Sequence, residues 1–588
     1  MTAHPAASRA ASLALLFAGA TLAFPFLLPE HRLPITSFYD EWLAVALGGA
    51  AVVAALFAAR ARAGEVPEAS AWFALLALWL GVQPFLRSPA YLQLPAAGIV
   101  FLGFAAALAW AGRALRDIFG AERAADLLAS FLVAAGVFNA VAGILQAYGV
   151  PRALEGLFAT SWGERSVGHV AQANTYACYL AAGQASLLYL LARRKPPAWA
   201  AWACGTLLAV GIAYSHSRTA VLYSVWLAAL AWFVAPSGRE DVRRLRVAAL
   251  AIGAGTLVAI FLLPPLHDLL GIPLRKPSRL RMFDPAVLGA ETRPMMWALS
   301  AALAARSPLA GTGWGEFAGG AFEAGLPPLM AKFSDIWSSP HNLFAQVLAE
   351  GGVVAGAIVV AAFGRWWWAA LAAVRREQSP ADGWVAAVAG VVCIHAMLEY
   401  PLWYAHVLAL LALVAGMVRG PAFNVPVSLL RTSFAAGLVG IAVLLAWTFA
   451  DYQRFESAFR TATGRTLAGP AEVAEARKTL AEVARGPLAP QAEPWLHASL
   501  ALDAPGMLEM GERVLRRAPD AQAVARHAAV LALAGRREEA EALVANGMAT
   551  FAVASRERLE AALGEAARSH PDAAAPLLDR VRAERRPE

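Results

Sequence analysis

The chain has 588 residues, 59% hydrophobic and 15% charged, and its mean hydropathy of +0.53 is too high for a soluble globular protein, so it predicts a polytopic membrane protein. The net charge of +7 does not point to nucleic acid, because the basic residues form short clusters between apolar runs. The three cysteines lie inside apolar segments without disulfide or zinc spacing, so neither a disulfide framework nor a metal site is expected.

Apolar runs long enough to cross a hydrocarbon core occur about thirteen times and predict an all-α bundle of transmembrane helices. The small residues of the first run resemble a cleavable signal peptide, but the many spans behind it favour a signal anchor that stays in the mature protein. The runs cover residues 10–29, 41–59, 70–86, 95–112, 126–148, 172–192, 198–214, 219–235, 247–264, 342–364, 384–399, 402–418 and 432–450.

Basic clusters between these runs predict the orientation of the chain. If Arg9 is cytoplasmic, the later clusters all fall on the same side, which the positive-inside rule assigns to the cytoplasm. The alternation then places the loop of residues 265–341, and everything after residue 451, on the opposite, outer face. The clusters are Arg60 and Arg62; Arg113, Arg116 and Arg123; Arg193, Arg194 and Lys195; Arg239, Arg243, Arg244 and Arg246; and Arg375 and Arg376.

Four parts of the chain follow from this reading: transmembrane helices in residues 1–264, an outer loop with candidate catalytic elements in 265–341, further transmembrane helices in 342–450, and an outer helical domain in 451–588. The last part is rich in Ala, Glu and Arg with helical periodicity, as in "AVARHAAVLALAGRREEAEALVANG". It resembles tetratricopeptide-like helical hairpins with a glycine turn, and an irregular helical bundle without true repeats is equally compatible.

Polar side chains gather at the outer ends of several spans. The stretch "ERSVGHVAQANTYACYL" brings Arg165, His169, Gln172 and Asn174 to one such end, where amides either bind sugar hydroxyls or tie two helices together. In "AYSHSRTAVL", Arg218 lies at the membrane boundary, where a guanidinium costs a few kcal/mol unless it has an anionic partner.

A second arginine lies in the outer loop. The stretch "ETRPMMWALSAALAARSPLAGTGWGEF" places Arg293 just ahead of an amphipathic helix, and the turn "GTGWG" after that helix permits close backbone approach. Because arginine offers a permanent charge and a bidentate fork, Arg218 and Arg293 facing one cavity would suit a diphosphate. Arginines that only reach for the membrane interface are the alternative interpretation.

The stretch "SSPHNLF" lies where the outer loop returns to an apolar run. Ser339 as N-cap and Pro340 as first helical residue predict that His341 lies in the first turn of a helix. The helix macrodipole and nearby arginines disfavour an imidazolium there, so His341 is expected to be neutral and able to accept a proton. A helix-capping or pore-lining histidine is the alternative.

The stretch "CIHAMLEYPLWYAHVLAL" carries an intramembrane histidine and carboxylate. His395 and Glu399 are four residues apart, so a helix would place them one above the other. Two ligands do not make a metal site. The interpretation favoured here is a structural hydrogen-bonded pair at a helix break before Pro401.

Together, "SHSRTA", the Arg293 stretch and "SSPHNLFAQVLAEGG" resemble the Wzy and WaaL type of bacterial glycan polymerases and O-antigen ligases, over about residues 160 to 455. Within that superfamily, "HAMLEYPLWYAHVLAL" is similar to the signature of the PglL-type O-oligosaccharyltransferases. The resemblance implies an inner-membrane glycosyltransferase of GT-C-like helical architecture that needs neither metal nor cofactor. Its active site would face the periplasm.

The resemblance also implies roles for individual residues. By motif, His341 matches the family's essential histidine, and Arg218 and Arg293 match its essential arginines, which would bind the donor diphosphate. Gln172 and Asn174 match a "QxN" element, although the chain has Ala171 and Ala173 where the family tends to have Gly and Pro. Supporting residues or residues that contact acceptor or glycan are expected to be Gln172, Asn174, Asn342, Glu399 and Tyr400.

The leading functional hypothesis is transfer of a glycan en bloc from undecaprenyl diphosphate to a Ser or Thr hydroxyl of a periplasmic protein such as a pilin. His341 would act as general base, and direct attack at the anomeric carbon predicts inversion because no nucleophilic carboxylate paired with an acid is evident. An O-antigen ligase acting on lipid A core, or a polysaccharide polymerase, is the main alternative. A transporter of lipid-linked glycans is a third.

Overall fold

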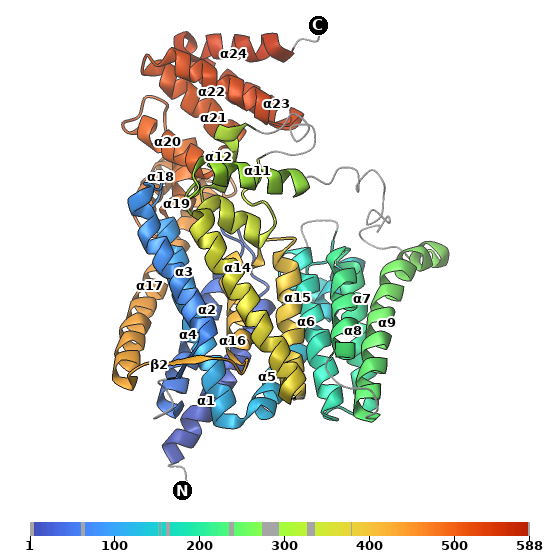
Figure 1. Ribbon diagram of the computed structural model, residues 1–588. Helices are drawn as coiled ribbons and strands as arrows, with labels where there is room; N and C mark the ends of the chain where they lie inside the picture. The colour runs from blue at the N-terminus through green and yellow to red at the C-terminus, as the bar shows by residue number, and fades with distance from the viewer. Residues whose placement is uncertain are drawn as a thin grey trace. The chain divides into compact units, whose positions relative to one another are not determined.

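The computed structural model of the chain describes residues 5–59, 65–150, 152–154, 156–159, 165–233, 240–272, 293–325, 336–377 and 379–585. Its regular elements are helices, apart from two three-residue strands (Figure 1). The chain divides into two compact units. Residues 1–75, 101–289 and 360–443 form the first unit, and residues 76–100, 290–359 and 444–588 form the second.

The first unit is a bundle of long apolar helices. Those that lie wholly within it are α1 (Pro5–Ala23), α2 (Phe38–Ala59), α5 (Ala121–Tyr148), α6 (Ala173–Ala192), α7 (Ala198–Tyr214), α8 (Thr219–Phe233), α9 (Glu240–Leu270), α15 (Pro380–Ala396) and α16 (Ala405–Gly416), with the short 3-10 helices η1 (Phe24–Leu27), η3 (Arg152–Leu154) and η5 (Pro401–Trp403). Four further helices contribute residues to both units: α3 (Glu68–Leu86), α4 (Gln93–Phe119), α14 (Leu343–Glu377) and α17 (Val427–Ala462).

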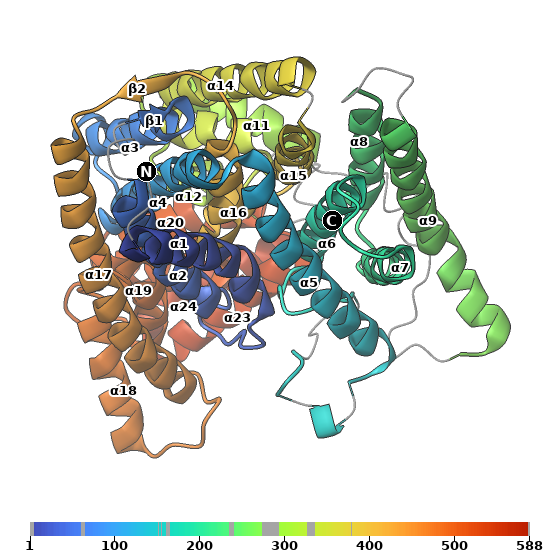
Figure 2. The ribbon, with the colours of Figure 1, turned by 90° about the horizontal axis from the view of Figure 1, so that it is seen from below.

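Helix α6 is almost completely enclosed in this bundle. It packs against α5, α7, α8, α9 and α15, and Figure 2 shows α5, α7 and α9 around it. Small residues allow this close packing, since a Cβ atom at Gly183 would lie 3.3 Å from the Leu208 side chain and 3.5 Å from the Leu132 carbonyl. A helix lined in this way can hold polar side chains at its end in a fixed position.

Each of the thirteen predicted apolar runs coincides with a helix, so the prediction of an all-α polytopic membrane protein is confirmed. Eight of these helices are long and apolar enough to cross a membrane by length and composition: α1, α2, α3, α4, α5, α9, α14 and α17. Shorter apolar helices are α7, α8, α15 and α16.

The predicted basic clusters that the structure describes converge on one end of the first unit, here called the basic end. Strand β1 (Glu65–Pro67) also pairs there with β2 (Ala422–Asn424) in an antiparallel register that sets Val66 opposite Phe423, a contact that the sequence did not predict. Arg60, Arg62 and Arg239 lie outside the described residues. Ion pairs at this end join Arg113 to Glu65 and Asp117, Arg116 to Asp382, Arg193 to Glu122 and Asp126, and Arg365 to Glu68.

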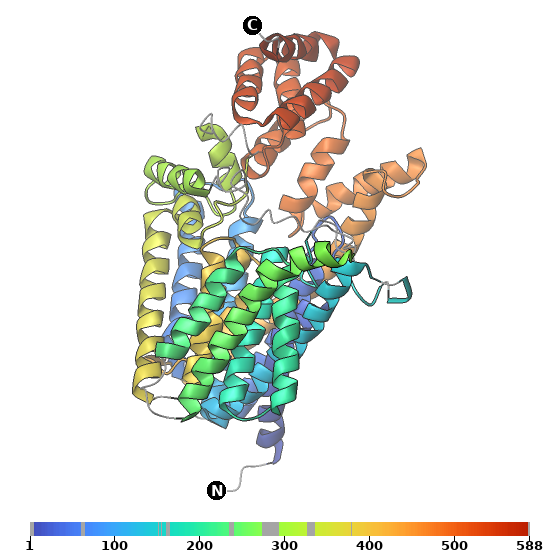
Figure 3. The same ribbon diagram turned by 90° about the vertical axis from the view of Figure 1, so that its right-hand side faces the viewer.

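The second unit contains the helices of the outer loop and the C-terminal helices. Two helices come from the loop, α11 (Arg293–Arg306) and α12 (Phe317–Ala324). The C-terminal helices, orange to red in Figure 3, are α18 (Pro470–Val483), α19 (Ala489–Ser499), α20 (Met507–Arg517), α21 (Ala521–Leu533), α22 (Arg537–Thr550), α23 (Val553–Ser569) and α24 (Pro571–Arg585). The hairpin predicted within this segment is present, because α21 and α22 are joined by a turn in which Gly535 has a φ of 78°.

Candidate active site

The start of α6 is the first polar feature of the first unit. Gln172 is the N-cap, because its side-chain oxygen accepts a hydrogen bond of 2.5 Å from the backbone amide of Thr175. Ala171 precedes the cap with a φ of 61°, and Ala173 is the first helical residue. These two positions favour glycine and proline respectively, so the two alanines keep the backbone geometry of the motif.

Arg165 is the centre of a hydrogen-bonded network at this helix start. Its Nη2 donates to Asn174 Oδ1 at 2.7 Å, and its Nε donates to the Ser215 carbonyl at 2.7 Å. Asn174 Nδ2 in turn donates to Glu399 Oε1 at 2.7 Å. One amide therefore links a guanidinium to a buried carboxylate, and with the bond from Arg165 to Ser215 the network ties the ends of α6, α7 and α15 together.

The charge of a second guanidinium, that of Arg218, acts on Arg165. Burial lowers the pKa of Arg165, Glu399 opposes that shift, and the charge of Arg218 adds to it. Arg218 is half-buried and directly precedes α8, in a turn where His216 has a φ of 49°. The charges that act on Arg165 are thus one carboxylate and one further guanidinium, and the excess of positive charge suits an anionic ligand.

Glu399 and His395 both contact α6, His395 from within α15 and Glu399 from beyond its end. Helix α15 ends at Ala396, so Glu399 lies beyond the helix, although its backbone amide still donates to the His395 carbonyl at 2.9 Å. His395 Nε2 lies 3.2 Å from Thr175 Oγ1, next to the bond between Glu399 and Asn174. The helix break before Pro401 is as predicted, while a stack of the two residues on one helix face is not observed.

Tyr400 follows Glu399 as the N-cap residue of η5, and its ring centroid lies 6.0 Å from that of Tyr404. The tyrosine is half-buried beside the Arg165 network. Among the residues that the structure describes, no group of three or more His, Cys, Asp or Glu side chains is placed to hold a metal ion.

His341 belongs to the second unit, and the prediction that it lies in the first helical turn is wrong. Helix α14 begins at Leu343, and Asn342 caps it by accepting a hydrogen bond of 3.0 Å from the backbone amide of Ala345. Ser339 instead accepts a bond of 3.1 Å from the backbone amide of His341, which closes a local turn. His341 therefore stands just before the helix with a φ of 54°, a conformation uncommon for residues other than glycine.

Two tryptophans fix the backbone and the ring around His341. The Trp337 ring centroid lies 4.6 Å from that of His341, and Trp297 Nε1 donates to the Pro340 carbonyl at 3.1 Å. Trp297 lies one turn after Arg293 in α11, so these two side chains share a helix face. Arg293 is thus the first residue of a helix whose next turn contacts the segment that carries His341.

The "GTGWG" turn contacts backbone rather than forming an open loop. Thr312 N donates to the Ala349 carbonyl at 2.8 Å, and Gly313 N donates to the Glu350 carbonyl at 3.1 Å. These carbonyls are free for the turn because α14 is kinked at Gly352, where φ is 71°. A Cβ atom at Gly311 would lie 2.4 Å from the Ala349 carbonyl oxygen, so the glycine is required for this contact.

Unusual backbone conformations coincide with these segments. Ala171, His216 and His341 are three of the four non-glycine residues in the described part of the chain with positive φ, and Arg194 at the basic end is the fourth. Strained backbone persists where surrounding structure holds it, and it clusters at functional sites. His341 is itself a candidate residue, Ala171 directly precedes Gln172, and His216 lies two residues before Arg218.

The structure thus gathers Gln172, Asn174, Arg218, Glu399 and Tyr400 in the first unit, and Arg293, His341 and Asn342 in the second. Arg165 had no assigned role in the sequence prediction. Its contact with Asn174 arises because the loop before α6 folds back over nine residues, and no helical or strand periodicity reports such a fold.

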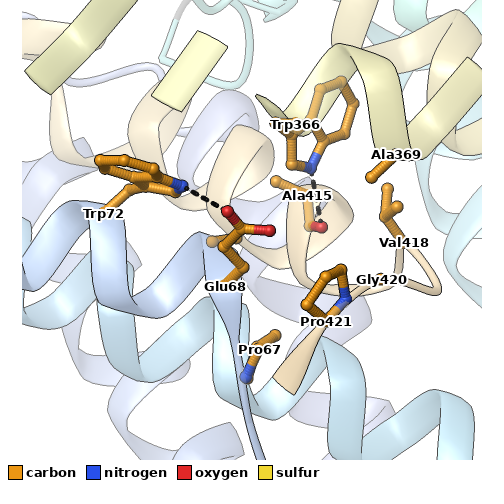
Figure 4. Close-up of a pocket in the computed structure, with 10 residues that line it drawn as sticks. Pro67, Glu68, Trp72, Trp366, Ala369, Ala415, Val418, Gly420 and Pro421 are labelled. Atoms are coloured by element: carbon orange, nitrogen blue, oxygen red, sulfur yellow. Dashed lines mark hydrogen bonds between the residues drawn. The ribbon is translucent and has the colours of Figure 1, made fainter. Parts of the chain in front are cut away.

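A pocket of about 310 Å³, partly open to solvent, lies at the basic end (Figure 4). Its polar groups are already used: Trp72 Nε1 donates to Glu68 Oε1 at 3.3 Å, and Trp366 Nε1 donates to the Ala415 carbonyl at 3.1 Å. Both oxygens of Glu68 also accept from Arg365 at 3.1 Å. We assign this pocket to packing, since the polar side chains that line it, Glu68, Trp72 and Trp366, are hydrogen-bonded within the protein.

Comparison with known proteins gives three matches. Residues 202–360 match the "O-Antigen ligase" family, and residues 384–563 match the "Virulence factor membrane-bound polymerase, C-terminal" family. The chain is also 24% identical over 463 residues to a "General O-oligosaccharyltransferase" of Acinetobacter baylyi, an alignment that covers 76% of each chain. The first family match contains Arg218, Arg293 and His341, and the second extends from α15 into the C-terminal helices.

A multi-pass membrane protein with these helices and these matched segments is a glycosyltransferase, and its matched segments are similar to the O-antigen ligase and polymerase superfamily. The similarity to the A. baylyi enzyme supports a PglL-type member of that superfamily.

Proposed function

We propose that the protein is an O-oligosaccharyltransferase, which moves a glycan from undecaprenyl diphosphate to a Ser or Thr hydroxyl of a periplasmic protein such as a pilin. The named activity of the A. baylyi relative supports transfer to protein. The observation that carries the chemistry is the partly buried network of Arg165, Asn174 and Glu399, on which the charge of Arg218 acts.

In this proposal the arginines stabilise the leaving group. A lipid diphosphate departs easily, so the enzyme must mainly balance the charge that builds on it. Arg218, with Arg165 next to it, supplies permanent positive charge in a partly desolvated position, and Arg293 supplies a further guanidinium. Their contribution is electrostatic and replaces the role that Mg²⁺ has in many phosphate-transfer sites.

His341 is the proposed general base. A neutral imidazole can take the proton of the attacking hydroxyl, a role worth about 10²- to 10⁴-fold in rate. The strained backbone and the Trp337 ring hold His341 in one orientation, and the Asn342 cap fixes the residue that follows it. Direct attack by the hydroxyl on the anomeric carbon forms the new glycosidic bond and releases the lipid diphosphate, which inverts the configuration.

The remaining polar residues are proposed to contact acceptor or glycan. Glu399, Asn174 and Tyr400 come together at one end of the first unit, where they can accept and donate hydrogen bonds to hydroxyl groups. Gln172 and Asn342 act through the helix starts that they cap. This end is opposite the basic end, and on the positive-inside rule it faces the periplasm of a bacterial inner membrane.

A competition experiment tests the acceptor. Purified enzyme in liposomes receives one radiolabelled lipid diphosphate-linked glycan together with a pilin, lipid A core and a second lipid-linked glycan. Label in pilin supports the proposal. Label in lipid A core identifies a ligase, label in a longer lipid-linked glycan identifies a polymerase, and movement of intact donor between leaflets identifies a transporter.

Metal removal is a separate prediction. Because arginines supply the charge at the leaving group, activity should persist in excess EDTA to within about twofold. The measurement is the initial rate of labelled glycan transfer with and without chelator, and with added Mg²⁺ as the control. Loss of activity that Mg²⁺ restores would instead assign the diphosphate to a metal ion.

A further inference from the structure

The C-terminal helices contact the turn that holds the His341 helix. We propose that Arg516, assisted by Arg517, at the end of α20 is a positioning residue for His341. The inference rests on the proposed role of His341 as the base. It concerns residues of the second unit alone.

Arg516 forms an ion pair with the buried carboxylate of Glu316. Arg516 Nε and Nη2 donate to Glu316 Oε2 at 3.0 and 2.6 Å, and Nη2 also donates to the Ser88 carbonyl at 2.7 Å. The Glu316 side chain is 2% exposed, and its other oxygen accepts from the backbone amide of Ala90 at 2.5 Å. A buried carboxylate left without this guanidinium would be strongly disfavoured, so Arg516 fixes the end of the glycine turn.

Arg517 makes a second contact with the same turn. Its Nη1 donates to the Gly315 carbonyl at 3.4 Å, one residue before Glu316. Helix α12 then lies so close to α20 that a Cβ atom at Gly319 would be 2.3 Å from the Arg516 carbonyl oxygen. The end of α20 and the segment from Gly315 to Gly319 therefore pack backbone against backbone.

The glycine turn is in turn hydrogen-bonded to α14. The bonds of Thr312 and Gly313 to the carbonyls at the α14 kink fix one side of the helix, and Phe317 N adds a bond of 3.3 Å to Glu350 Oε1. Gln346 Nε2 donates to the same Glu350 oxygen at 2.9 Å, and Gln346 N donates to the Asn342 carbonyl at 2.9 Å. Asn342 is the residue directly after His341, so few bonds separate Arg516 from the proposed base.

Hydrophobic packing also connects the C-terminal helices to the segment that carries His341. Phe317 and Ala321 of α12 are buried with Met296 and Ala349 in the core beneath His341. Phe322 of the same helix lies in the core of the C-terminal helices, where its ring stacks on Phe551 at 5.8 Å. One short helix thus belongs to both cores, and displacement of the C-terminal helices would move the support of His341.

The test compares Arg516→Ala, Arg516→Lys and the control Arg513→Ala in the full-length enzyme. Arg513 lies one turn earlier in α20 and also pairs with a buried glutamate, Glu493 at 3.2 Å, without a contact to the turn. We expect Arg516→Ala to lower kcat about 10- to 100-fold with the donor KM changed less than about twofold, since a misplaced catalytic group loses rate and not binding. Arg516→Lys should recover most of the rate, and Arg513→Ala should keep it.

Hydrogen exchange measured by mass spectrometry supplies a readout independent of catalysis. In Arg516→Ala, amides in peptides covering residues 311–317 and 343–353 should exchange faster than in the wild type, and in Arg513→Ala they should not. Unchanged exchange, an unchanged kcat, or a raised donor KM at constant kcat would each overturn the proposal. His341→Ala is measured in parallel: if it stays active, the base assignment fails, while the exchange data still report whether Arg516 holds the turn.

Discussion

His341 owes its position to a turn, and the helix comes only after it. Ser339 and Asn342 hold the backbone on either side of it, and Trp337 covers one side of its ring. An imidazole held this way loses little freedom when it meets a hydroxyl, which is the condition for an efficient base.

Replacing His341 should abolish most of the activity while leaving the fold intact. His341→Ala should lower the rate of glycan transfer by about 10²- to 10⁴-fold, because the proposed mechanism uses this imidazole to take the hydroxyl proton. The assay is transfer from a lipid diphosphate donor to pilin in liposomes. His570→Ala, a change at the end of α23, serves as the control and should retain wild-type activity. A His341→Ala enzyme with wild-type turnover would refute the base assignment.

Ala171 gives a residue-scale prediction about stability. With a φ of 61°, an alanine there carries a conformational penalty of roughly 1–2 kcal/mol that glycine avoids. Ala171→Gly should therefore raise the thermal unfolding temperature in detergent, by an amount reduced by the greater freedom of glycine in the unfolded chain. Ala173→Gly, two residues on within α6, should lower it. Equal shifts for both variants would show that the strain at Ala171 is not significant.

At the scale of elements, the kink in α14 is the feature on which the support of His341 depends. Gly352 has a φ of 71°, and a Cβ atom there would lie 2.2 Å from the Leu309 carbonyl oxygen. The clash involves backbone, so it cannot be relieved by rotating a side chain. The kink turns the Ala349 and Glu350 carbonyls toward the glycine turn, which keeps both segments in register.

Gly352→Ala should thus destabilise the enzyme by more than about 2 kcal/mol and reduce its activity, because the new side chain forces the helix and the turn apart. Gly364→Ala is a matched control in the same helix, where an added Cβ atom meets nothing within 4 Å. That variant should be neutral or slightly more stable, since alanine has the higher helix propensity. Chemical or thermal unfolding in detergent, with transfer activity, separates the two. Equal behaviour would show that α14 tolerates a straight helix here.

The elements differ in how far the sequence predicts them. Apolar runs give every long helix of the bundle, because burial in lipid or in the bundle demands continuous hydrophobicity. The sequence predicts the start of α14 three residues too early. The Ser339 side chain accepts a hydrogen bond from His341, and Asn342 caps the helix instead. The β1 and β2 pairing and the partner of the glycine turn depend on residues far along the chain, which local patterns do not report.

The sequence likewise predicts only some residues of the candidate site. Resemblance to a family selects His341, Arg218 and Arg293, residues that carry chemistry in a short motif. It does not select Arg165, whose contacts with Asn174 and Ser215 come from loop folding. It also does not select Arg516, which lies 175 residues after His341 along the chain.

For the molecule as a whole, buried histidines predict how the second unit responds to acid. Burial and the nearby charge of Arg526 lower the pKa of His497 to about 4, compared with an ordinary value near 6.5. The unfolded chain therefore binds this proton more readily than the folded chain between those two values. Stability from the neutral His497 is fully present above pH 6.5 and is lost as the pH falls toward 4.

We expect hydrogen exchange in peptides of α19 to α21 to accelerate progressively between pH 6.5 and pH 5, after correction for the intrinsic exchange rate. The loss of unfolding free energy from one histidine reaches at most about 1.4 kcal/mol per pH unit. His497→Gln, which does not titrate, should show a weaker pH dependence than the wild type. A steeper or identical dependence in that variant would assign the acid sensitivity to other groups.

Helix α12 has a practical consequence for exchanging parts between relatives. Its side chains belong both to the core that contains Met296 and Ala349 and to the core of the C-terminal helices. A domain boundary placed at residue 451 would therefore separate side chains that pack together. A chimaera that replaces only the C-terminal helices would pair a foreign Phe551 face with the resident α12. The C-terminal helices can therefore be exchanged between relatives with this packing intact only if residues 76–100 and 290–359 are exchanged with them as one block.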